Sequence, residues 1–136
     1  GKIVLLSIKP EKINRLIELT GNKNIIDTNL LEEITLGISH STLGSLICKK
    51  WKFNEALVKV IEFHHRPHMA PDKYRELVYM IYLAYVFSEI ENRNMRFEIL
   101  DEDVLEYFHL TDKKNFDMLH NILKESYNTY FGGKPV

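Results

Sequence analysis

The chain has 136 residues, of which 45% are hydrophobic and 27% charged, as in a soluble globular protein. Its formal net charge of −1 gives no global positive field, so we expect no nucleic-acid partner. The longest apolar stretch, residues 77–87, is well short of the roughly 20 residues of a membrane span, so we expect no membrane partner. The one cysteine, Cys48, cannot form a disulfide framework, which favours a cytoplasmic protein.

Apolar residues recur at helical spacing almost everywhere, and no segment shows sustained alternation with a period of two. The sequence therefore predicts an all-α fold without a sheet, built as a compact bundle of about seven helices. No repeat and no linker divides the chain. We expect one domain over residues 1–136, with residues 132–136 as a frayed tail.

Short helices are expected in the first half of the chain, at about residues 3–7, 10–21, 28–37, 40–51 and 54–65. Pro10 suits a first helical turn, and Gly21 and Gly37 suit helix ends. Asn54 is the expected N-cap of the last of these helices. Two of the helices have an apolar side, which is expected to consist of Leu30, Leu31 and Ile34 in one and of Leu43, Leu46 and Ile47 in the other.

One long helix and two further helices are expected after a loop bounded by Pro67 and Pro71. The first runs from about residue 72 to 92, is apolar nearly all round and should form the hydrophobic centre. Asp101 and Thr111 are the expected N-caps of the other two. The last helix carries a stripe of apolar residues, namely Phe116, Leu119, Leu123, Tyr127 and Tyr130.

Three histidines occupy positions that suit a ligand site. His64 continues the apolar spacing of its helix, and His65 lies beside it. His40 leads the apolar stripe of an earlier helix, and Gly44 follows one turn later on the same side. A glycine there would let another backbone, or a ligand, come close.

Glu32 or Glu33 adds a carboxylate to this stretch of the chain, and imidazole and carboxylate are usual ligands of Zn, Fe or Mn. However, a histidine that faces a core is more often a hydrogen-bonded structural residue than a ligand. Adjacent histidines on a helix also point about 100° apart, so they rarely bind one ion together. We therefore expect no cofactor, with a divalent metal as the alternative.

Three segments resemble the HDOD domain, an output domain related to the HD phosphohydrolases. Residues 36–44, LGISHSTLG, look like its pattern LG-x-D/S-H followed by a glycine four residues later. KKWKF at 49–53 resembles its tryptophan element, and ALVKVIEFHHRP at 56–67 resembles L-V-x-x-I-x-x-H-H-x-P. The order and spacing of the three segments agree, and the resemblance is most specific over residues 30–90.

The resemblance implies an HD-like bundle that begins just after the place of the superfamily's histidine-aspartate pair. GKIVLL at residues 1–6 looks like the segment that follows this pair. The N-terminal helices of the full domain would then be missing, which would expose apolar surface. We expect a homo-oligomer, or exchange of elements between protomers, through that surface.

In catalytic relatives, metals bind between the histidine-aspartate pair and later histidines, which His40, His64 and His65 match one by one. Three features depart from the active pattern, and the first is that the histidine-aspartate pair is not in this chain. Arg66 stands where active cyclic-di-GMP phosphodiesterases have an acidic residue, and PHMAP at residues 67–71 lacks the glycine-tyrosine-proline motif. Without its ligands a two-metal site can neither clamp the reacting oxygens nor generate hydroxide.

The resemblance therefore implies a non-catalytic, bacterial-type signal-transduction domain that acts through a protein partner or a small ligand. Its relict ligand pocket would comprise His40, Gly44, His64, His65 and Glu32. Two alternatives stay open: a metal-dependent HD-type phosphohydrolase, and a helical protein whose histidines only satisfy the core. A small basic cluster, Lys49, Lys50 and Lys52 around Trp51, is too short for a nucleic-acid site and is expected to be a solvated helix end.

Overall fold

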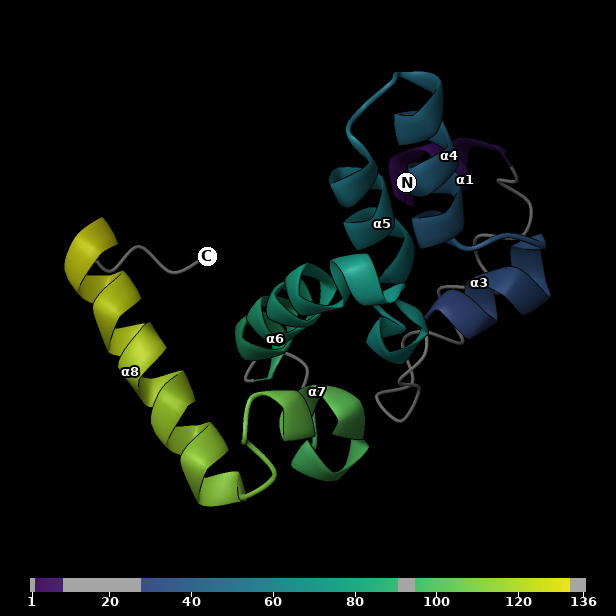
Figure 1. Ribbon diagram of the computed structural model, residues 1–136. Helices are drawn as coiled ribbons and strands as arrows, with labels where there is room; N and C mark the ends of the chain where they lie inside the picture. Colours follow the sequence, from purple (N-terminus) through teal and green to yellow (C-terminus); the bar gives the residue numbers. More distant parts are fainter. Residues whose placement is uncertain (1, 9–27, 91–94, 133–136) are drawn as a thin grey trace. The chain divides into compact units, whose positions relative to one another are not determined.

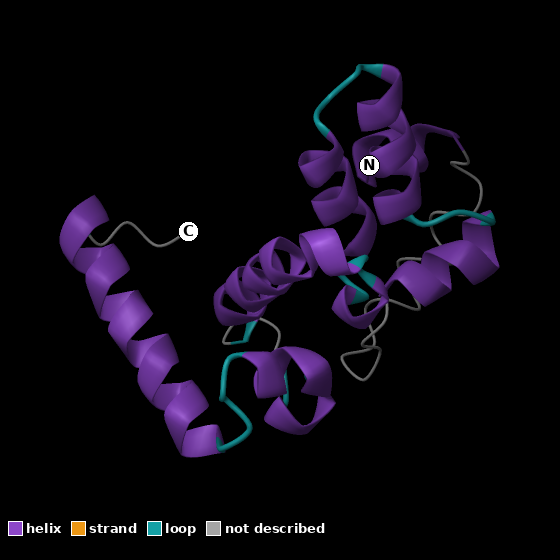
Figure 2. Ribbon diagram, in the orientation of Figure 1, coloured by secondary structure: helices purple, strands orange, loops and turns teal. Residues whose placement is uncertain are grey.

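The computed structural model describes residues 2–8, 28–90 and 95–132. Within these residues the regular structure consists of seven α-helices and three short 3₁₀ turns, with no strand (Figures 1 and 2). The all-α prediction is confirmed. The helix expected at residues 10–21 lies outside the described residues, and so do residues 133–136 of the expected tail.

Contacts divide the chain into two compact units, residues 1–95 and 96–136. No change in composition marks this division in the sequence, because residues 91–97 contain neither glycine nor proline. That the two units fold as one domain stays a prediction. Each unit is described by itself below.

The first unit is centred on helix α4. Its described helices are α1 (Lys2–Ile8), α3 (Thr28–Leu36), α4 (His40–Lys50), α5 (Glu55–Phe63) and α6 (Arg75–Glu89), with 3₁₀ turns η2 (Pro67–Met69) and η3 (Asp72–Tyr74) before α6. Helix α4 contacts α1, α3 and α5, and α5 in turn contacts α6 (Figure 1). This packing places the start of α4 beside the end of α5, where the predicted histidines lie.

Local chemistry fixes the ends of these helices. Gly37 has a φ of 83°, the left-handed conformation that ends α3 as predicted. The Ser39 hydroxyl then caps α4 by accepting the Thr42 N–H at 3.4 Å. Asn54 caps α5 as predicted, because its Oδ1 accepts the Leu57 N–H at 2.8 Å.

The predicted apolar face of α3 is wrong for two of its three members. Leu30 is half exposed and Ile34 is 73% exposed, whereas Leu36 is buried in a small cluster with Leu5. Helical spacing places Leu30, Leu31 and Ile34 within about 100° of one another, but the structure leaves Leu30 and Ile34 of that face exposed. The inward face is instead set by polar residues that bond to α4, and it comprises Asn29, Glu32 and Leu36 at spacings of three and four.

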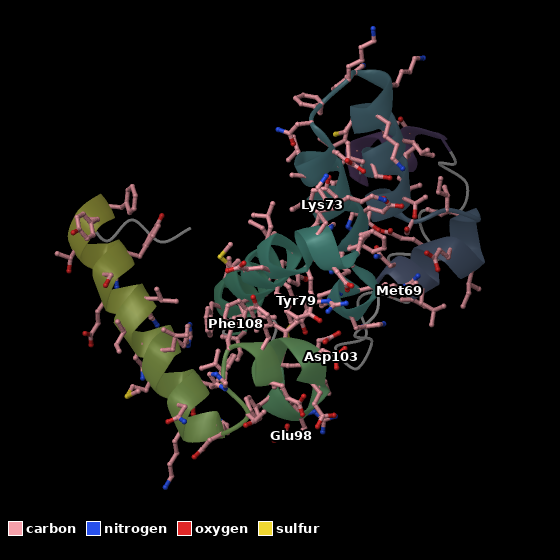
Figure 3. All side chains as sticks on the ribbon, viewed as in Figure 1. Met69, Lys73, Tyr79, Glu98, Asp103 and Phe108 are labelled. Carbon is pink, nitrogen blue, oxygen red and sulfur yellow. The ribbon has the colours of Figure 1, made fainter. Side chains whose placement is uncertain are left out.

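Helix α6 buries one continuous stripe, which consists of Val78, Tyr79, Tyr82, Leu83 and Val86. Tyr79 is labelled in Figure 3. Met80 and Ile81 lie on the other side and are exposed, so α6 has two faces although its sequence is apolar nearly all round. Among the described helices, none is both long enough and apolar enough to cross a membrane.

The second unit consists of η4 (Phe97–Ile99), α7 (Glu102–Tyr107) and α8 (Lys113–Phe131). Phe116 is fully buried and its ring lies 5.3 Å from that of Phe97, centre to centre. Asp101 is the N-cap residue of α7 as predicted, but α8 is capped by Asp112 and not by Thr111. The Asp112 carboxylate accepts the Lys114 N–H at 2.8 Å, and a carboxylate is the stronger acceptor at a positive helix end.

Candidate three-histidine site

The packing of α4 against α5 brings His40, His64 and His65 together. His40 is the first residue of α4, and the two others lie in the turn that follows α5. Each offers one ring nitrogen, and these nitrogens all lie within 4.8 Å of one another. The His40 ring centre is 5.5 Å from that of His64 and 5.0 Å from that of His65.

The two adjacent histidines converge because α5 ends before them. The helix was expected to continue to His65, and on a continuous helix the two rings would point apart. Instead α5 ends at Phe63, and the Arg66 N–H bonds to the Phe63 carbonyl at 2.9 Å. The ring centres of His64 and His65 are then only 4.1 Å apart. The premise of the sequence argument, that the two rings point apart, does not hold for this pair.

Glu32 holds His40 by two hydrogen bonds to the same oxygen. Its Oε2 accepts the His40 backbone N–H and the His40 Nδ1–H, both at 2.7 Å. Both residues are buried, with Glu32 5% and His40 6% exposed. Because an ionised carboxylate can only accept, this contact requires a proton on His40 Nδ1, and in a neutral ring the lone pair is then on Nε2.

His64, like His40, uses Nδ1 for its hydrogen bond, but its partner is a backbone carbonyl. Its Nδ1 lies 2.8 Å from the Ile61 carbonyl oxygen, which can only accept a hydrogen bond. In a neutral ring the lone pair of His64 would therefore also be on Nε2. Histidines that bind metals usually donate the other ring N–H to a carboxylate or a backbone carbonyl, which are the two partners seen here.

His65 is placed by an aromatic contact. Its ring lies edge-on to Tyr85 of α6, with 5.0 Å between the ring centres. Gly44, which was predicted to belong to the same pocket, is buried on α4 one turn after His40. The roles of these residues as a ligand pocket stay predictions.

Arg66, which follows His65 in the sequence, forms a bidentate salt bridge with Glu33. The guanidinium donates to both carboxylate oxygens of Glu33, at 3.1 and 2.9 Å. Glu33, one of the two candidate carboxylates, is therefore paired with Arg66, and Glu32 is the carboxylate that contacts a histidine. The pair is about one-third exposed on each side, so its contribution to stability is small.

A buried polar network between α3 and α4 was not predicted. Asn29 Nδ2 donates to Ser41 Oγ at 2.9 Å, and Ser41 Oγ lies 3.2 Å from Ser39 Oγ. Within the part of the chain that the structure describes, Asn29 Oδ1 has no hydrogen-bond partner although it is buried. The network positions the start of α4, and therefore His40. Small polar residues on both sides of His40 in the sequence were the signal for it.

The donor set fits one cation of the imidazole-binding kind. In a tetrahedral site with metal–nitrogen bonds of about 2.0 to 2.1 Å, the ligand nitrogens lie roughly 3.4 Å apart. Small rotations of the three rings would close the present spacing, which is at most 4.8 Å. His40, His64 and His65 would be the ligands, while Glu32 and the Ile61 carbonyl would orient two of them.

Comparisons with known proteins agree with the sequence motifs. The family model of the HDOD domain matches residues 1–67. An uncharacterized protein of Treponema pallidum (strain Nichols) is 23% identical over 127 residues, which cover 93% of this chain and 25% of that protein. The chain thus spans about a quarter of the length of this curated relative. No solved structure matches the chain significantly. The predicted resemblance to the HDOD domain is confirmed over residues 1–67.

Proposed function

We propose that this protein is a non-catalytic regulatory domain of a signalling pathway, whose three-histidine site binds a small ligand or a single divalent cation. The observation that carries this proposal is the engagement of both nearby carboxylates. Glu33 is paired with Arg66, and Glu32 Oε2 accepts two bonds from His40. Three imidazoles are the ligands that remain among the described residues at this place.

A two-metal hydrolytic site needs more than three imidazoles. It holds two ions about 3.5 to 4 Å apart, so that they stabilise both the attacking and the leaving oxygen. One cluster of three or more potential ligand side chains occurs within the described residues, and it contains no carboxylate. These features support binding in place of phosphate-ester hydrolysis.

The alternative function is a metal-dependent phosphohydrolase of the HD type. One observation favours it, which is that His40 and His64 both hold their rings in the orientation of metal ligands. This alternative requires further carboxylate ligands beyond those described.

Metal content and hydrolysis distinguish the two functions. We expect at most one equivalent of metal by plasma mass spectrometry, and no hydrolysis of bis(p-nitrophenyl) phosphate with added manganese. Any bound metal should be lost in His64→Ala and kept in the control His68→Ala, which changes an exposed histidine outside the cluster. Two equivalents of metal, with hydrolysis that disappears in His64→Ala, would establish the enzyme instead.

A regulatory domain of this kind needs a partner that reads its state. We propose a protein partner and a cytoplasmic location. Because the chain is a quarter of the length of its relative, the partner can be another part of a longer protein as well as a separate chain. Co-purification of the full-length protein with and without Zn²⁺ would test a ligand-dependent partner, and an unchanged set of bound proteins would speak against it.

A further inference from the structure

The turn between α4 and α5 presents two aromatic rings to solvent on a fixed backbone. Residues 49–53, KKWKF, are here called the basic–aromatic turn. The Lys52 N–H bonds to the Lys49 carbonyl and the Phe53 N–H to the Cys48 carbonyl, both at 3.0 Å. Lys52 has a φ of 58°, so the turn is a Schellman motif with a lysine in the left-handed position. A backbone fixed in this way loses little conformational entropy when it binds.

The exposed surface of this turn consists of two aromatic side chains and three lysines. Trp51 is 69% exposed, and its ring centre lies 6.4 Å from that of Phe53, which is half exposed. Lys49 lies 3.7 Å from Glu62, whereas Lys50 and Lys52 form no ion pair with any described residue. Tryptophan is among the residues that contribute most to binding at protein interfaces. The turn therefore fits a negatively charged protein surface with an apolar spot.

Two other kinds of partner fit the turn less well. Lipid-binding basic clusters usually contain four to eight lysines or arginines. This turn has three, of which one is paired. Nucleic-acid binding depends on many phosphate contacts, and the net charge of the chain is −1.

The second unit of this same chain contains a surface of the required chemistry. Residues 98–107, here called the acidic segment, contain no lysine or arginine and five acidic residues, which are Glu98, Asp101, Glu102, Asp103 and Glu106. Glu98 and Asp103 are labelled in Figure 3, and four of the five acidic residues are exposed. Tyr107 at the end of the segment is also exposed and supplies an aromatic contact.

We infer that the basic–aromatic turn of one copy of this chain binds the acidic segment of a second copy. In a twofold dimer this contact forms twice, because each copy contributes one turn and one segment. The two contacts would reinforce each other in the dimer. The inference names a partner for the proposed regulatory domain and so rests on that proposal for its meaning in signalling. Its test does not involve the histidine site.

The test measures the dissociation constant of the dimer for the full chain by sedimentation velocity over a range of concentrations, in low and high salt. We expect Lys50→Glu with Lys52→Glu to raise that constant by about tenfold or more, because two attractive pairs become repulsive. Trp51→Ala should raise it about 30-fold, as expected for an interface anchor. High salt should also weaken the dimer. Circular dichroism would establish that each variant keeps its helical content.

A matched control and a rescue make the test specific. Lys113→Glu with Lys114→Glu changes the net charge by the same amount at two exposed positions outside the turn, and it should not weaken the dimer. The segment variant, Glu102→Lys with Asp103→Lys, should also weaken the dimer when it is measured by itself. A mixture of this variant with the turn variant should associate again, because each turn then meets a segment of opposite charge. A wild-type chain that stays monomeric at every concentration, or a mixture without rescue, would overturn the inference.

Discussion

Replacing Glu32 tests the interaction that holds the three-histidine site. Its Oε2 accepts two hydrogen bonds from His40, one from the backbone and one from the ring, both at 2.7 Å. In Glu32→Ala both donors would stay buried and lose their acceptor, because His40 is only 6% exposed. The start of α4 would lose its link to α3 at the same time.

The expected magnitude follows from the two bonds. A hydrogen bond to a charged group contributes about 1.5 to 3 kcal/mol, so the loss of both predicts a destabilisation of about 3 to 5 kcal/mol. Glu32→Gln keeps an oxygen that can accept both bonds, loses the charge and replaces Oε1 by an NH₂ group, so we expect a cost of about 2 kcal/mol. The neighbouring Glu33→Ala should cost at most about 1 kcal/mol, because its ion pair with Arg66 is partly exposed and screened by water.

Urea denaturation followed by circular dichroism would measure these free energies of unfolding. The slope of the free energy of unfolding against urea concentration should be the same in all variants, so that differences between midpoints report stability alone. We predict that Glu32→Ala destabilises the protein most, Glu32→Gln less and Glu33→Ala least. If Glu32→Ala costs less than Glu33→Ala, or no more than Glu32→Gln, the carboxylate does not hold the start of α4 and the reasoning is refuted.

Three further substitutions test other parts of the fold. The Tyr74 hydroxyl donates to Glu55 at 2.6 Å and lowers the pKa of that carboxyl below 4.5, so Tyr74→Phe should raise this pKa, measured by NMR titration. Because the pKa is lower in the folded state, the associated stability is present above about pH 4.5 and is lost as the pH falls through the folded value. Lys52→Gly should stabilise the protein by about 1 kcal/mol in thermal denaturation, since glycine adopts the left-handed conformation without strain; a lower melting temperature would contradict this. Phe116→Ala should cost about 3 to 5 kcal/mol in urea, because the ring is fully buried, and a cost below 1 kcal/mol would contradict that packing.

The sequence predicted best where local chemistry decides the structure. Gly37 ends α3 and Asn54 caps α5, because a left-handed glycine and an amide cap act within a few residues. The cap of α8 was misplaced by one residue, since Thr111 and Asp112 are adjacent and both are residue types that cap helices. The buried face of α3 could not be predicted, because polar contacts with α4 selected it against the apolar pattern.

The proximity of the three histidines agrees with the sequence, but their arrangement was not predicted, and their role as a ligand pocket stays a prediction. His40, His64 and His65 come together as the motif spacing indicated. The choice between Glu32 and Glu33 depends on the rotation of α3 about its axis, which is fixed by contacts distant in sequence. The convergence of His64 and His65 depends on where α5 ends, and their spacing in the sequence is the same for a helix and for a turn.

The engagement of Glu32 also limits which cations suit the site. To become a metal ligand through Oε2, Glu32 would have to release the His40 N–H, and a buried unsatisfied donor costs about 1 to 3 kcal/mol. Glu32 Oε2 therefore orients His40, and the cluster of potential ligands among the described residues consists of three imidazoles. Imidazole suits Zn, Cu, Fe and Ni, whereas Mg and Mn prefer carboxylate and water oxygens. Titration calorimetry should therefore show binding of Zn²⁺ or Ni²⁺ that is lost in His40→Ala, and no binding of Mg²⁺. Preferential binding of Mg²⁺ or Mn²⁺ would mean that Glu32 or another carboxylate enters the site as a ligand.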